Sequence, residues 1–155
     1  MSENVSENET EKTYEKHLIF SAGDRRYALP SRIISEVAAL EKVFPLPLLP
    51  GYVRGIINRY SIPYALIDLN FLLLNISSGS GKIIVLKEEV DKIALLIDDV
   101  IDIADLSPED LMKTAQEESS TTDLIHAFFE WKDSPVFCLD TSELLNRIKR
   151  DYEQN

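Results

Sequence analysis

Short apolar runs separated by turn residues follow one another along most of this chain. The runs "HLIFSA" and "RRYALP" flank Gly23-Asp24, and two strand-like runs around a two-residue turn with glycine predict a β-hairpin. Many short strands at this spacing are typical of an all-β barrel or sandwich. The further runs are "IISEVAAL", "YVRGIIN", "YALIDLNFLLL", "KIIVLK", "KIALLI", "VIDIADL", "IHAFFEW" and "PVFCLD".

Two segments favour helix over strand. In "LSPEDLMK", Ser107 is a candidate N-cap and Pro108 suits the first helical position, which predicts one or two helical turns. The C-terminal segment "TSELLNRIKRDYEQ" follows a candidate cap at Asp140 or Thr141, and its apolar residues recur at helical spacing. An amphipathic helix lying on the barrel is therefore expected, with these apolar positions facing it: Leu144, Leu145, Ile148 and Tyr152.

The chain divides into a polar N-terminal tail and one domain. Residues 1–16 are acidic and nearly free of apolar side chains, so we expect a disordered tail, with a single domain over 17–155. The tail lacks the charge and apolar pattern of a signal peptide. The longest apolar run, "IPYALIDLNFLLLNI", is shorter than the roughly 20 residues that a spanning helix needs. We expect a cytoplasmic protein without direct membrane insertion.

Charge narrows the class of partner. The net charge is −11, from 16 Lys and Arg against 27 Asp and Glu, so nucleic acid and anionic membrane surfaces would repel the chain. Proteins or small molecules remain as partners. The single cysteine, Cys138, lies in the apolar run "PVFCL", where we expect a buried core thiol.

Candidate chemistry is sparse. His17 and His126 each lie in a strand-like run, and neither has a Cys or Glu at metal-binding spacing, so they are expected to be core or edge residues. No local signature of a nucleophile with its base appears. We therefore expect a non-enzyme that needs no cofactor or metal.

The order of several motifs resembles the CheW-like adaptor domains of bacterial chemosensory systems, over about residues 17–148. "FSAGDRRYALP" is similar to the opening hairpin of that family, and "IISEVAAL" to its V-x-E-I segment. "PLPLLPGYVRGIIN" resembles its prolines before a hydrophobic-x-G-h-h-N motif, and "LIDL" its v-D-L. "IALLIDDVIDIADLSPEDL" and "VFCLDTSELL" look like its later strands and final helix start.

The resemblance implies a fold and a function. The fold would be two small five-stranded SH3-like β-barrels that share a hydrophobic interface, followed by the C-terminal amphipathic helix. The function would be non-catalytic coupling of chemoreceptors to a CheA-type histidine kinase, through the regulatory domain of the kinase and the cytoplasmic tip of the receptor, with recruitment to membrane receptor arrays. The expected partner-binding residues are Ile34, Glu36, Asn58, Arg59, Tyr60 and Asp68.

One family motif is missing. Arg59, Tyr60 and Ser61 stand where the family has Leu-Arg-Gly, which indicates a divergent paralogue with altered partner contacts. Pro63 cannot donate to a β-ladder, and proline in sheets is confined to edges, strand starts and bulges, so whether residues 59–65 form a bulge stays open.

Two alternatives stay open. The same fold would also suit a scaffold for a kinase pathway outside chemotaxis, such as motility or surface attachment. An enzyme or small-molecule sensor would use a cleft between the barrels, with Asp98, Asp99 and Asp102 as inward carboxylates of raised pKa.

Overall fold

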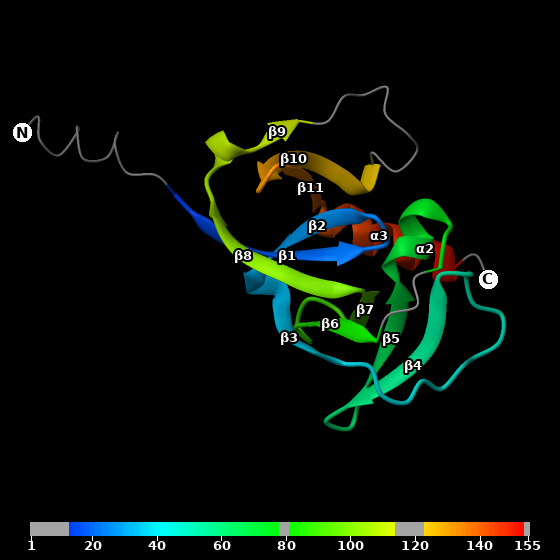
Figure 1. Ribbon diagram of the computed structural model, residues 1–155. Helices are drawn as coiled ribbons and strands as arrows, with labels where there is room; N and C mark the ends of the chain where they lie inside the picture. The colour runs from blue at the N-terminus through cyan, green and yellow to red at the C-terminus, as the bar shows by residue number, and fades with distance from the viewer. Residues whose placement is uncertain (1–12, 78–80, 114–122, 154–155) are drawn as a thin grey trace, which may run out of the picture.

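The computed structural model describes residues 13–77, 81–113 and 123–153, which form two β-sheets (Figure 1). The first sheet has the strand order β8-β1-β2-β11-β10-β9. We call this sheet, with the side chains that it encloses, barrel A. Its strands are β1 (Glu15–Ala22), β2 (Arg25–Pro30), β8 (Asp99–Leu106), β9 (Met112–Lys113), β10 (Ile125–Trp131) and β11 (Ser134–Leu139).

The second sheet, barrel B, has the strand order β3-β6-β7-β5-β4 and is built from the middle of the chain. In each barrel a hairpin strand also pairs in parallel with a later strand, β2 with β11 and β5 with β7. The strands of barrel B are β3 (Ile34–Ala39), β4 (Val53–Arg59), β5 (Ile62–Asp68), β6 (Lys82–Leu86) and β7 (Ile93–Ile97).

The helices are short except for the last. They are η1 (Ser31–Ile33), α2 (Leu69–Leu74), η2 (Pro108–Asp110) and α3 (Thr141–Glu153). The prediction of all-β architecture with a C-terminal helix is confirmed. Barrel A differs from the expected five strands by β9, a two-residue strand at its edge.

Three apolar clusters explain why the strand sequences are continuously apolar. One cluster lies inside barrel A and includes Ile19 and Cys138, and one lies inside barrel B and includes Ile57 and Ile83. The third cluster joins side chains of both barrels with α2 and α3, and there Leu18 and its neighbours occupy the opposite face of β1. Because successive side chains of a strand point to opposite faces, strands between two cores are buried on both sides. The shared interface and the buried Cys138 are therefore as predicted.

The Gly23 turn fastens barrel A to barrel B. Gly23 has φ +65, and its N–H donates to Asp98 Oδ2 at 2.7 Å. An added Cβ at Gly23 would lie 2.7 Å from Oδ1 of Asn70 in α2. This confirms the predicted hairpin, and at this positive φ any side chain in place of Gly23 would be strained and would have to displace the Asn70 side chain.

The run "YALIDLNFLLL" was predicted as one strand, and this is wrong for its second half. β5 ends at Asp68, whose Oδ1 accepts the N–H of Phe71 at 3.1 Å and so caps α2. Asn75 ends the helix in the left-handed region at φ 61. A short apolar run has too few residues for its period to separate a strand from a buried helix.

The predicted helical segments are confirmed. Asp140 is the N-cap of α3 and accepts the N–H of Glu143 at 3.1 Å, while Leu144 and Ile148 are buried. The turn at Pro108 is the single-turn η2, in which the Ser107 N–H donates to Asp110 at 2.8 Å.

The expected disordered tail over 1–16 lies mostly outside the described residues. The structure places Glu15 and Lys16 in β1, so the first strand begins two residues before the predicted boundary at residue 17. Among the helices of the described residues, none is both long and apolar enough to span a membrane.

Candidate functional site

The segment 59–62 is the turn of the β4–β5 hairpin. Arg59 pairs with Ile62, and the two residues between them, Tyr60 and Ser61, have φ 53 and 68. Two central residues with positive φ define a type I′ turn, which usually takes Asn or Gly. The polar residues Tyr60 and Ser61 therefore form the turn that connects β4 to β5. The open question of a bulge at 59–65 is answered by the register, whose shift lies earlier, between Val53 and Gly55.

A bidentate ion pair lies beside this turn. Arg59 Nη2 is 3.0 Å from Glu36 Oε1, and Arg59 Nε is 3.3 Å from Oε2 of the same carboxylate. The hydrogen bond to Glu36 raises the pKa of the Arg59 guanidinium. The side chains of Arg59 and Glu36 are only 17% and 26% exposed, so the pair is partly shielded from solvent. Two predicted site residues from separate strands are thus in contact.

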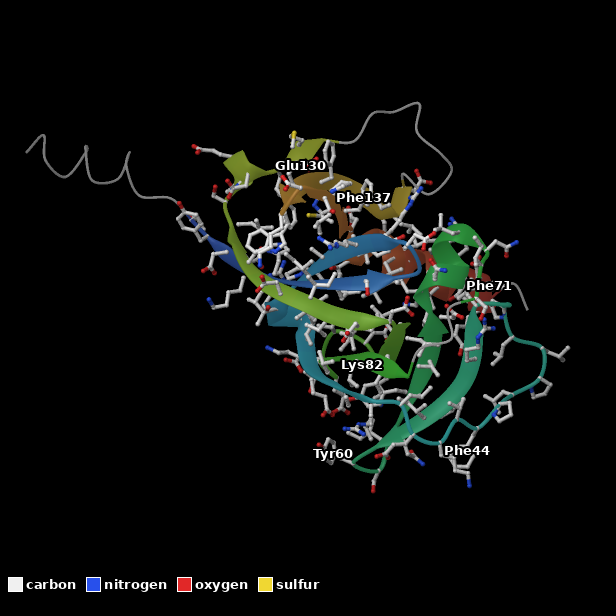
Figure 2. All side chains as sticks on the ribbon, viewed as in Figure 1. Phe44, Tyr60, Phe71, Lys82, Glu130 and Phe137 are labelled. Carbon is white, nitrogen blue, oxygen red and sulfur yellow. The ribbon has the colours of Figure 1, made fainter. Side chains whose placement is uncertain are left out.

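Tyr60 projects from the same turn into solvent. It is 80% exposed, and its ring centroid lies 5.3 Å from Cζ of Arg59. Figure 2 shows Tyr60 at the end of barrel B that is remote from barrel A. The neighbouring Asn58 is also exposed. Glu36, Asn58, Arg59 and Tyr60 therefore form one group, which we call the barrel B tip.

Ile34 and Asp68 lie apart from the barrel B tip. Ile34 is half-buried and packs against the core between the barrels, and a register shift separates it from Glu36. Asp68 is fully buried. Its side chain therefore offers no surface to a partner, and we remove it from the predicted contact residues.

Asp68 has a structural role that involves Arg54, a residue which the sequence analysis missed. Arg54 Nη2 lies 2.7 Å from Asp68 Oδ2, and Ser77 Oγ donates to the same oxygen at 3.2 Å. Arg54 also donates to the carbonyl of Gly51 at 2.8 Å. A lone Arg in the apolar run "YVRGII" was the available signal, because an Arg among buried positions requires an acidic or carbonyl partner.

A second missed feature is the proline arm, residues 43–50. Phe44 and Ile56 exchange backbone hydrogen bonds of 2.8 and 2.9 Å, so the arm pairs with β4. Gly55 makes this crossing possible, since an added Cβ would lie 2.4 Å from the Phe44 carbonyl oxygen. The arm leaves three apolar side chains exposed, Phe44 at 42%, Leu46 at 49% and Leu48 at 89%.

The proline arm also borders a groove next to the barrel B tip. The groove has a volume of about 220 Å³, and its lining includes Lys42, Phe44, Asn58 and Arg59. Leu48 combines an exposed apolar side chain with φ 60, an unfavourable backbone region for leucine. The run "PLPLLP" was the sequence signal for this arm, because closely spaced prolines stiffen the backbone and prevent a helix.

Comparisons with known proteins identify the family. The family model of the CheW-like domain matches residues 16–149. The chain belongs to the CheW-like domain family. It is similar to "Chemotaxis protein CheW" of Treponema pallidum (strain Nichols), with 27% identity over 135 residues, 82% of this chain and 79% of that protein.

A solved structure supports the fold of this CheW-like chain. The scaffolding protein TtCheW from Thermoanaerobacter tengcongensis superposes with a TM-score of 0.74 at 18% sequence identity. The match covers 84% of this chain and 87% of that structure. At this identity the likeness concerns the fold, and it extends over both barrels.

The acidic run of this CheW-like domain does not form the inward carboxylate site of the sensor alternative. The hydrogen bond from Lys82 lowers the pKa of Asp99, as does the N–H of Val100. The N–H of Ile103, and then Lys132, lower the pKa of Asp102. The expectation of raised pKa values is therefore wrong for these two residues, whose carboxylates are paired at the surface.

Proposed function

We propose that this protein is a non-catalytic adaptor of bacterial chemotaxis signalling that couples chemoreceptors to a CheA-type histidine kinase. The proposal rests mainly on the CheW-like family match over residues 16–149, which spans both barrels. The curated relative is named as a chemotaxis protein and the solved one as a scaffolding protein. The adaptor acts by binding, with no reaction and no cofactor of its own, in the cytoplasm and at receptor arrays.

The barrel B tip supplies one of the partner contacts. Tyrosine and arginine are enriched among the residues that dominate binding energy at interfaces, and Tyr60 presents a nearly complete aromatic surface. Arg59 is held by Glu36 and lies against Tyr60, so little side-chain freedom remains to be lost on binding. The proline arm extends this surface with apolar side chains on a stiffened backbone.

The barrel B tip also accounts for a change of partner contacts. The family has Arg at the position of Tyr60, whereas here the guanidinium sits one residue earlier and is neutralised by Glu36. The exposed residue of the turn is therefore aromatic and uncharged. A partner that fits this tip presents an apolar pocket or a cation for the tyrosine ring, in place of an acidic group.

Binding measurements with the two expected partners test this function. The full chain is titrated with the regulatory domain of the cognate kinase and, separately, with a cytoplasmic receptor tip, using calorimetry. We expect binding to both. Tyr60→Ala should weaken one of the two interactions by about 2 kcal/mol, roughly 30-fold, as for an interface tyrosine that dominates binding.

Tyr14 offers a matched control, because it is an exposed tyrosine, at 56%, just before the first strand of barrel A. Tyr14→Ala should leave both affinities within about twofold of the unsubstituted protein. Binding to neither partner would contradict the adaptor function. Equal losses for Tyr60→Ala and Tyr14→Ala would contradict the assignment of the contact to the barrel B tip.

A further inference from the structure

A cavity of about 390 Å³ opens at one end of barrel A. Its walls come from the start of β1, the end of β8 with η2, β10, and the junction of β11 with α3. Glu15 at the start of β1 pairs with Leu106 at the end of β8, so this end of the strand pair forms one side of the cavity (Figure 1). Two lining residues nearby, His17 and Ser107, are only 9% and 3% exposed. The cavity therefore has almost buried polar side chains in its wall.

His17 presents a hydrogen-bond acceptor without a protein partner. Its Nδ1 lies 3.0 Å from the backbone carbonyl oxygen of Glu15. Because a carbonyl oxygen only accepts, Nδ1 carries the hydrogen of the neutral ring, and Nε2 is left with a lone pair. Within residues 13–77, 81–113 and 123–153, no group donates a hydrogen bond to Nε2. An almost buried polar atom of this kind at a cavity wall indicates a bound molecule or a water.

Ser107 and Asp140 add further acceptors to the cavity lining. The hydroxyl of Ser107 donates its only hydrogen to Asp110 Oδ2 at 3.1 Å, so a lone pair of Oγ remains available. Asp140 Oδ1 accepts the N–H of Glu143 at 3.1 Å, and the carboxylate has further lone pairs on Oδ2. His17 Nε2, Ser107 Oγ and Asp140 Oδ2 thus offer lone pairs and no hydrogen.

The charges of the lining favour a cation over an anion. Arg32 and Glu15 form an ion pair, so their charges offset each other. With neutral imidazoles at His17 and His126, the carboxylate of Asp140 leaves the lining with one net negative charge. The N-terminus of α3 carries the positive end of the helix dipole, but the same carboxylate caps it. The chain as a whole carries −11, which attracts cations from a distance.

We propose that this cavity binds a small organic ammonium, a short primary amine in its protonated form. An –NH3+ group has three donor hydrogens and no acceptor, which matches the available lone pairs of His17, Ser107 and Asp140. Hydrogen bonds from a charged donor are also stronger than those between neutral groups. The cavity volume lies within the range of ordinary small-ligand pockets. A short carbon chain would pack against the apolar part of the wall, which is formed by Pro30, Leu106, Pro108, Leu111 and Leu139.

The two histidines of the chain, His17 and His126, both line the cavity and provide a direct probe of its contents. Proton NMR resolves their imidazole signals, and His126→Gln assigns them. The full chain is titrated with propylammonium chloride at about pH 8, where an alkylamine is charged and a histidine side chain is mainly neutral. We expect saturable shifts of the His17 signals.

Tetramethylammonium chloride is the matched control ligand, because it has the same charge and no donor hydrogen. If hydrogen bonds to the lining acceptors hold the ligand, tetramethylammonium should bind about tenfold or more weakly than propylammonium. Both titrations are made at the same ionic strength, adjusted with sodium chloride, so that screening is equal.

Asp140→Asn tests the charge of the cavity. Asparagine is also a good N-cap, so α3 should persist while the negative charge is lost. We expect the affinity for propylammonium to fall by about threefold or more, as for loss of a partly exposed charge contact. Asp24→Asn is the matched control, because it removes the same charge from an exposed turn that does not line the cavity, and it should leave the affinity unchanged.

His17→Phe tests the buried acceptor independently of charge. Phenylalanine keeps an aromatic ring in β1 and removes Nε2, so the affinity should fall by about tenfold or more. The His126 signals report binding in this variant, and circular dichroism shows that it is folded. This second variant keeps the test informative if Asp140→Asn disturbs α3.

Shifts that do not saturate, or equal affinity for propylammonium and tetramethylammonium, would overturn the inference. Equal losses in Asp140→Asn and Asp24→Asn would do the same, as would an unchanged affinity in the folded variants Asp140→Asn and His17→Phe. These measurements use the protein alone and no kinase or receptor. Their outcome is therefore independent of the adaptor function.

Discussion

Each barrel contains a hairpin with a two-residue turn, and the two turns share one backbone conformation but differ in what their side chains contact. In barrel B, Tyr60 and Ser61 have φ 53 and 68; in barrel A, Lys132 and Asp133 have φ 52 and 69. Each turn joins two paired strands through two residues. Neither turn contains a glycine, so both accept a backbone region that costs non-glycine residues about 1 kcal/mol or more.

The difference lies in what each turn contacts. Lys132 forms an ion pair with Asp102 of β8 at 3.3 Å, and its Nζ lies 5.8 Å from the Trp131 ring centroid. Tyr60 is 80% exposed and lies against Arg59 of its own hairpin. The barrel A turn is therefore tied back to its barrel, whereas the barrel B turn holds an aromatic side chain out toward solvent. The same strained turn closes one barrel and presents a surface on the other.

The largest expected loss of stability follows from substitution of Asp68, which lies between β5 and α2 in barrel B. Asp68→Ala removes the cap of α2 and leaves Arg54, whose side chain is 32% exposed, without its carboxylate. Breaking a buried ion pair from one side costs about 3–5 kcal/mol. Urea denaturation should show a loss of this order in the free energy of unfolding. Asp24→Ala, in the exposed β1–β2 turn of barrel A, should stay within about 0.5 kcal/mol. A loss below about 1 kcal/mol for Asp68→Ala would mean that the hydrogen bonds to the Asp68 carboxylate contribute little to stability.

The proline arm of barrel B should be the next most sensitive feature. Gly55→Ala adds a Cβ that meets the Phe44 carbonyl oxygen, at a residue with φ 140, and we expect a loss of about 2–4 kcal/mol. Thermal and urea unfolding measure it. Gly81→Ala is the matched control, because its Cβ would have no neighbour within 4 Å. Equal stability of the two variants would show that the proline arm can shift to accommodate the added methyl group at little cost in free energy.

Glycine substitutions compare the two turns directly. Tyr60→Gly relieves the positive φ and removes no tertiary contact beyond Arg59, so it should stabilise the fold by about 0.5–1 kcal/mol while weakening partner binding. In Lys132→Gly the same relief is offset by loss of the Asp102 pair, so its stability should change by less than about 0.5 kcal/mol. Paired urea curves, with binding assays, check both. Destabilisation by Tyr60→Gly would show that the tyrosine belongs to the fold.

The smallest expected effect is the pH dependence of the stability that the Lys132–Asp102 ion pair contributes to barrel A. The N–H of Ile103 and Lys132 lower the pKa of Asp102 in the folded protein, so its ionised form favours folding. This stabilisation is present at neutral pH and is lost as the pH falls through the lowered pKa, below about 3.9. Asp102→Asn should therefore be less stable than the parent at pH 7 and approach it in acid. A constant difference between the two across the pH range would contradict this.

Local patterns sufficed for much of the fold. Alternating and continuous apolar runs predicted the strands, Gly23-Asp24 predicted the first hairpin, and the spacing of Leu144 and Ile148 predicted α3. These features depend on neighbours within a few residues, for which periodicity and turn propensity are informative. The β4–β5 turn escaped prediction because Tyr60-Ser61 lacks the residues that such a turn prefers.

The site depended on contacts between distant segments. The sequence determined that Glu36 and Arg59 are available in a β domain of the CheW-like type, but only the pairing of strands placed them 3.0 Å apart. Barrel closure likewise buried Asp68 against Arg54 and brought His17 and His126 to one cavity. Parallel pairs such as β2 with β11 join the two ends of the chain, and no local period encodes such a pairing. Local preference thus fixed which elements form, while the packing of two closed sheets decided which side chains meet.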